Sequence, residues 1–171
     1  MALTQIIGSG ISGTTINSSG ILIPKGVLLS VNATNTDQAF DHTAGFTKIQ
    51  WENVEIDTIS GWSTSNHRYT PSVAGYYLVG GNVRMALTSV HQFVQLTVVK
   101  NGNQDGTRLV AQIQLNSDNL FNGNYAIPSG IVELNGSTDY IEVFINADED
   151  LTIHDISSTK SNFFATLVHA T

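Results

Sequence analysis

Histidine and carboxylate side chains are the residues of this sequence whose chemistry would carry catalysis or metal binding. The five histidines, His42, His67, His91, His154 and His169, show neither the HxH nor the HExxH spacing of metal sites. The sequence also lacks cysteine, a GxSxG nucleophile motif and a phosphate-binding glycine loop. It therefore predicts a protein that is not an enzyme and that has no cofactor.

Carboxylates gather at one place in the sequence, the acidic run Asp148, Glu149 and Asp150. Calcium prefers oxygen ligands, so these three residues are the candidates for a Ca²⁺ site. The run lacks the spacing of an EF-hand loop, and a solvated acidic loop is the alternative interpretation.

The two tryptophans are predicted to differ in exposure. Trp51 alternates with Ile49, which is typical of a core position on a strand. Trp62 lies in the Gly- and Ser-rich stretch 60–66, so we expect it on the crest of a loop. An exposed indole there is a candidate contact for a sugar or another ligand.

The elements that carry these side chains read as strands throughout. Runs of alternating apolar and polar residues recur between turn signals, and no window has the 3.6-residue period of a helix. About ten strands are predicted, near residues 27–31, 47–57, 66–70, 75–85, 91–100, 108–115, 130–134, 139–146, 151–154 and 162–169. This pattern predicts an all-β sandwich or jelly roll.

Two of these strands carry bulky apolar residues on both faces, at 139–146 and 162–169. One face of a strand in a sandwich meets the core, so the second face needs another partner. We expect that partner to be another subunit or an arm.

Composition limits the function classes. The chain has 171 residues, 41% of them hydrophobic, and a formal charge of −7. Its seven basic residues are scattered and form no stripe for phosphates, so no nucleic-acid partner is expected. No apolar run approaches the roughly 18 residues of a membrane helix, so no membrane partner is expected either.

Residues 1–20 are rich in Gly, Ser and Thr and predict a flexible or extended arm, followed by one domain at 21–171.

One stretch carries a family resemblance. Tyr69-Thr70-Pro71 followed by Gly75-Tyr76-Tyr77 resembles the aromatic-Thr-x-Pro-x-x-Gly-x-Tyr-aromatic motif of the C1q and tumour-necrosis-factor superfamily. A turn and strand at 135–144 and a final aromatic strand at 162–168 follow the family order. The sequence around Phe46 to Trp51 is similar to C1q-like modules of bacteriophage and cyanophage structural proteins.

The resemblance implies a ten-stranded jelly roll whose three copies pack around a threefold axis through an aromatic-rich face. The residues that it places at this trimer interface are Tyr77, Tyr140, Phe144, Phe164 and Val168.

Together these features predict a structural protein of a phage virion, made in the host cytoplasm. We expect a trimeric cement or decoration protein that binds the major capsid protein or other virion proteins and stabilises the shell. The alternatives are the receptor-binding tip of a tail fibre and a free C1q-like or lectin-like recognition protein.

Overall fold

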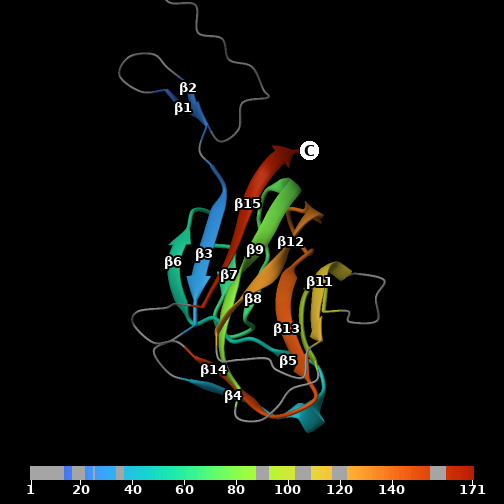
Figure 1. Cartoon of the computed structure of the whole chain (residues 1–171). Helices are drawn as coiled ribbons and strands as arrows, with labels where there is room; N and C mark the ends of the chain where they lie inside the picture. Colours follow the sequence, from blue (N-terminus) through green and yellow to red (C-terminus); the bar gives the residue numbers. More distant parts are fainter. Residues whose placement is uncertain are drawn as a thin grey trace, which may run out of the picture.

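The computed structural model describes residues 26–33, 37–87, 93–102, 109–116, 123–154 and 161–171. It also describes the backbone of a short hairpin, β1 (Thr14–Ile16) and β2 (Leu22–Pro24). Apart from this hairpin, the described chain forms two antiparallel sheets and one short 3₁₀ turn, η1 (His42–Ala44). The sheets face each other in a sandwich (Figure 1).

The larger sheet has seven strands. Its order is β4 (Gln38–Phe40), β14 (Leu151–His154), β9 (Ala74–Leu87), β15 (Asn162–Ala170), β3 (Leu28–Asn32) and β6 (Asn53–Asp57). The seventh strand, β12 (Gly123–Asn135), pairs with β9. The long strand β9 therefore organises this sheet, with β14 and β15 sharing one of its edges (Figure 1).

The smaller sheet has six strands. Its order is β11 (Leu109–Asn116), β10 (Phe93–Lys100), β13 (Ile141–Ala147), β8 (Arg68–Tyr69) and β7 (Trp62–Ser63), with β5 (Thr47–Lys48) also paired to β13. The turn Asn101-Gly102, with both residues at positive φ, ends β10.

The core lies between the sheets and follows the two-residue period of the strands. Tyr77, Val79, Val83 and Met85 of β9 are fully buried there. Burial of such side chains contributes about 1.5–3 kcal/mol each relative to exposure. Trp51 stacks on Phe163 with ring centroids 6.3 Å apart, which confirms its predicted core position.

The all-β class is confirmed, and most predicted strands are present. The expected strand at 47–57 is divided, because Ile49 and Trp51 turn into the core between β5 and β6. The strand expected at 130–134 is longer and begins at Gly123. The hairpin β1–β2 crosses the predicted boundary after residue 20, and the rest of the predicted arm lies outside the described residues.

Among the described residues, no helix has the length and apolar character needed to cross a membrane.

Candidate functional site

The outer face of the larger sheet carries a group of apolar side chains that the core does not cover. Residues paired in register point to the same side of a sheet. Leu28, Thr166, Leu78 and Ile131 form one such row across four strands. Because Tyr77 next to Leu78 faces the core, this row faces outward.

The larger sheet has more exposed hydrophobic side chains than the smaller sheet. Ile131 is 63% exposed, Val168 60% and Tyr76 40%, and Val54 and Ile56 of β6 are also exposed. One further large hydrophobic residue in the described part of the chain is exposed, Leu109 on β11 of the smaller sheet. The exposed apolar residues therefore gather on the larger sheet. We call Tyr76, Leu78, Ile131, Phe164 and Val168 the apolar face.

The apolar face carries little charge. Phe164 lies over Gly80, where an added Cβ would approach Phe164 Cζ to 3.1 Å and Ser129 Oγ to 2.8 Å. Around it, Ser30 and Thr166 supply neutral hydroxyls. Glu133 and His169 flank Tyr76 in register at one end of the sheet. Such a surface suits contact with another apolar, neutral surface.

The structure divides the residues predicted for the trimer interface. Phe164 and Val168 belong to the apolar face. Tyr77 does not, since it is fully buried in the core and donates a hydrogen bond from its hydroxyl to the Val73 carbonyl oxygen at 2.7 Å. Burial raises the pKa of the Tyr77 hydroxyl to about 12. The prediction for Tyr77 was wrong, because its side chain already packs inside its own subunit.

Phe144 lies on β13 of the smaller sheet, on the side that faces away from the core, and Tyr140 directly precedes this strand. The Arg68 guanidinium lies 4.3 Å from the centre of the Tyr140 ring. Phe144 is only 7% exposed, with the Lys48 ammonium 5.8 Å from its ring centre. These two aromatic rings are therefore held within the subunit and do not share a surface with Phe164 and Val168.

Trp62 also differs from its prediction. It is half-buried against the core, and its indole N–H donates a hydrogen bond to the Trp51 carbonyl oxygen at 3.2 Å. The Asp57 carboxylate accepts from the Trp62 backbone N–H at 2.8 Å. The expected position on the crest of a loop was wrong, because β7 pairs with β8 and draws Trp62 onto the core.

The acidic run does not converge as expected for a calcium site. Asp148 accepts a hydrogen bond from the Phe93 backbone N–H at 3.3 Å. Asp150 instead meets His42, whose Nδ1 lies 2.7 Å from Asp150 Oδ1. Asp41, His42 and Asp150 bring their ligand atoms within 4.8 Å of one another, and all three are exposed. Sequence analysis missed Asp41 and His42, because they lie far from Asp150 along the chain.

Charge pairing dominates this group. The hydrogen bond to Asp150 is the main cause that raises the pKa of His42. The same contact lowers the pKa of Asp150. The Thr43 hydroxyl and amide lower the pKa of Asp41. The chemistry of the group is thus that of an ion pair between a histidine and a carboxylate.

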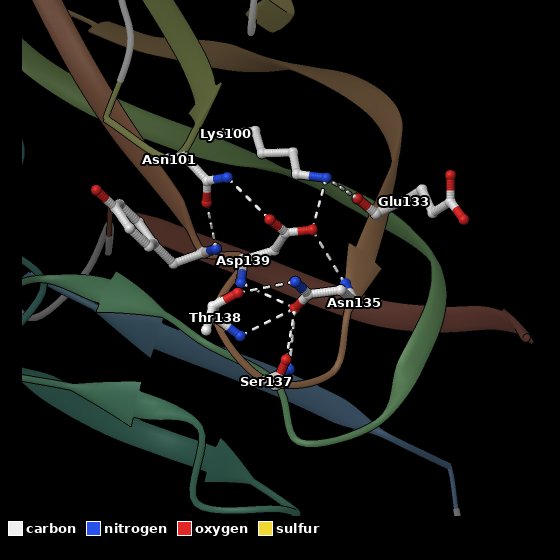
Figure 2. A network of polar contacts seen from close by, with 8 residues as sticks. Lys100, Asn101, Glu133, Asn135, Ser137, Thr138 and Asp139 are labelled. Carbon is white, nitrogen blue, oxygen red and sulfur yellow. Dashed lines mark hydrogen bonds and ion pairs between the residues drawn. The ribbon is translucent and has the colours of Figure 1, made fainter.

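A polar network fixes the turns at one end of the sandwich (Figure 2). Asp139 accepts from Asn101 Nδ2 at 2.8 Å, from Lys100 Nζ at 2.7 Å and from the Asn135 N–H at 3.1 Å. The side-chain oxygen of Asn135 accepts from the backbone N–H groups of three following residues. The Glu133 carboxylate points away from this network (Figure 2). Its geometry indicates a structural role.

Comparison with known proteins gives the fold. No family model and no curated protein matches the chain. Among solved structures, Eiger TNF from S. frugiperda matches with a TM-score of 0.61 and 13% identity, covering 85% of this chain and 94% of that one. Murine APRIL at pH 5.0 gives 0.60 and 14%, covering 84% and 100%. The globular domain of zebrafish complement 1qA gives 0.56 and 11%, covering 85% and 99%.

These neighbours are TNF-family and C1q domains, which are not enzymes. Sequence identities this low indicate shared architecture only. The chain has the jelly-roll fold of the TNF and C1q globular domains.

Proposed function

We propose that this protein is a non-enzymatic structural component of a phage virion that acts as a homotrimer on the capsid surface. The uncovered apolar face is the observation that supports the proposed trimer. Monomeric soluble proteins rarely leave large contiguous apolar patches in water. Closed cyclic symmetry covers each copy of such a patch with a neighbouring subunit.

The contacts of the apolar face suit this role. Tyr and Phe supply large buried area in interfaces, and charged residues are depleted at their centres. Tyr76 and Phe164 provide the aromatic rings, while Ile131 and Val168 provide exposed aliphatic side chains. Three subunits that bury this face would leave the smaller sheets outermost, where they are available for other virion proteins.

The charges that the structure describes agree with a protein partner. Lys48 pairs with Glu142, Lys100 pairs with Asp139, and Arg68 stacks on Tyr140. These three basic side chains are engaged within the subunit, so they do not form a basic stripe for a phosphate backbone. Capsid subunits or other virion proteins are the partners that we propose, and a shell cement would use many weak contacts at once.

Immunogold electron microscopy of the source particles tests the virion role. Label spread over the heads is the expected result for a capsid decoration protein. Label confined to tail or fibre ends would replace that role with the receptor-binding alternative. Particles without label would overturn both, and light scattering of the purified protein would separately test whether it is a trimer.

A free recognition protein is the second candidate function. The names of the structural neighbours, TNF, APRIL and complement 1qA, favour it. Such a protein would stay in the soluble fraction when a lysate is sedimented through a density gradient. Co-sedimentation with intact particles, retained after a salt wash, is the result expected for the virion protein.

A further inference from the structure

Strand β4 is a three-residue edge strand attached to one partner, β14. Phe40 pairs with Leu151 and Gln38 pairs with Ile153, so the whole strand lies along β14. A strand this short makes few backbone hydrogen bonds, and edge strands open more readily than central ones. Contacts made by the side chains at its two ends therefore contribute much of the stability of its attachment to β14.

A histidine–aspartate pair ties each end of β4 to β14. At one end Asp37 Oδ1 lies 2.7 Å from His154 Nδ1. At the other end His42 Nδ1 lies 2.7 Å from Asp150 Oδ1, which also accepts from the His42 backbone N–H at 3.0 Å. Asp37 precedes β4 and pairs with His154 at the end of β14, whereas His42 follows β4 and pairs with Asp150, which precedes β14. We call these pairs the two clasps.

The segment held by the clasps lines one side of a pocket of mixed character. The pocket has a volume of about 290 Å³; Phe40, Ile145 and Ile153 contribute apolar lining, and polar and charged side chains make up most of the remainder. The Gln38 side chain bonds the backbone N–H and carbonyl of Gln50 across it. Detachment of β4 would remove residues 37–40 from this lining and expose the backbone edge of β14.

The clasp between His42 and Asp150 depends on pH. The pKa of His42 is raised by its contact with Asp150, so the contribution of this clasp is complete below about pH 6.5 and is lost as the pH rises through the raised value. On the acid side the pKa of Asp150 is lowered, so the contribution is present above about pH 3.8 and is lost as the pH falls through the lowered value.

Other charged groups face the clasps within the described part of the chain. Asp41 and Glu149 lie near His42, and both favour its charged form. Arg84 lies directly across from His154 in the register of β14 and β9. Lys48 and Glu52 lie on the pocket lining beside Asp37.

We propose that β4 is a pH-gated edge strand, which the two clasps hold on β14 and which loosens at its His42 end above neutral pH. Loosening frees the edge of β14 for pairing with an added strand.

Amide hydrogen exchange of the full-length protein tests this proposal. Protection factors, corrected for intrinsic exchange, would be measured at about pH 5.5 and about pH 8, on either side of the ordinary histidine pKa. Protection of residues 38–40 and 151–153 should fall about two- to fivefold between these conditions, as expected for an exposed ion pair. Protection in β10 should stay constant.

Matched variants separate the clasps from general effects of pH. The double variant Asp37→Asn with Asp150→Asn should lose the pH dependence at β4, because neither histidine then has a carboxylate partner. His169→Asn removes an exposed histidine from the opposite end of the larger sheet and should keep it. Equal protection of β4 at both pH values in the wild type, or an unchanged pH dependence in the double variant, would overturn the proposal.

Discussion

Gly80 and Gly81 are adjacent residues of β9 in the segment that pairs with β15. A Cβ at Gly81 would lie 2.1 Å from the Asn162 carbonyl oxygen, well inside contact distance. The missing side chain therefore lets the two strands pair in the observed register. At Gly80 the same lack of a side chain makes room for the Phe164 ring on the apolar face.

Gly81→Ala should lower the free energy of unfolding by about 2 kcal/mol, because the new methyl group must displace backbone. Gly26→Ala is the matched control, since an added Cβ there meets no atom within 4 Å. Urea denaturation of both variants measures the difference. Equal midpoints for the two variants would contradict the close approach of β9 and β15.

Asp139 gives a prediction about acid stability. Burial raises its pKa, but hydrogen bonds from Asn101 and Lys100 outweigh burial and lower the pKa overall. The stabilisation is therefore present above about pH 3.8 and is lost as the pH falls through the lowered value.

Asp139→Ala should cost about 2 kcal/mol at neutral pH, as for a hydrogen-bonded charge. The cost should shrink as the pH falls through the lowered pKa of Asp139, where the wild-type carboxylate becomes protonated. Denaturation at neutral pH and at a series of acidic pH values measures it, with Glu149→Ala as the control at an exposed acid. A cost that does not change with pH would show that the charge of Asp139 is unimportant.

The side chains of β9 show what the sequence could predict for single residues. Tyr77 shares the parity of Val79, Val83 and Met85, so alternation alone assigns it to the core. The neighbouring Tyr76 then faces outward. The interface prediction named Tyr77 because it followed the family motif. The motif has two adjacent aromatic positions and does not show which of them faces the core.

At the scale of elements, alternation predicted the long strands well and the short ones poorly. Strands β10, β13 and β15 were predicted within about three residues of their ends. Strands β4 and β7 were missed, since three and two residues are too few to show a period. Strand β4 exists because β14, distant in sequence, supplies its hydrogen bonds, whereas β7 pairs with β8, the next strand along the chain.

Strand β7 gives a prediction of its own. Trp62→Phe removes the indole N–H and leaves the Trp51 carbonyl oxygen without that donor. The free energy of unfolding should fall by about 1 kcal/mol. Chemical denaturation measures this change. Unaltered stability would favour the earlier interpretation of Trp62 as an exposed contact residue.

The candidate sites show the same limit of sequence analysis. Asp150 was identified as part of an acidic run, but its partner His42 is 108 residues away. The pairing of β4 with β14 brings the two together. Since β4 itself was not predicted, nothing in the local sequence could have identified the clasps.

At the scale of the whole molecule, the apolar face makes the trimer testable with exposed residues. Ile131→Asp places a charge at the centre of this face. Leu109→Asp is the matched control, because Leu109 is exposed on the smaller sheet. Neither change disturbs the core, so both variants should fold.

Light scattering at micromolar concentration should give a trimeric mass for the wild-type protein and for Leu109→Asp. Ile131→Asp should give a smaller mass, because a buried charge without a partner is costly in an interface. A trimeric Ile131→Asp variant would place the contact elsewhere. A monomeric wild-type protein would contradict the trimer itself.

The position of β15 has a consequence for how the protein is made. This strand lies between β3 and β9, yet it is translated after both of them. While the ribosome is still adding the intervening residues, β3 and β9 lack their shared neighbour and present unpaired backbone edges. The larger sheet can therefore close only after β15 has left the ribosomal exit tunnel, and nascent chains are most prone to aggregation until that moment.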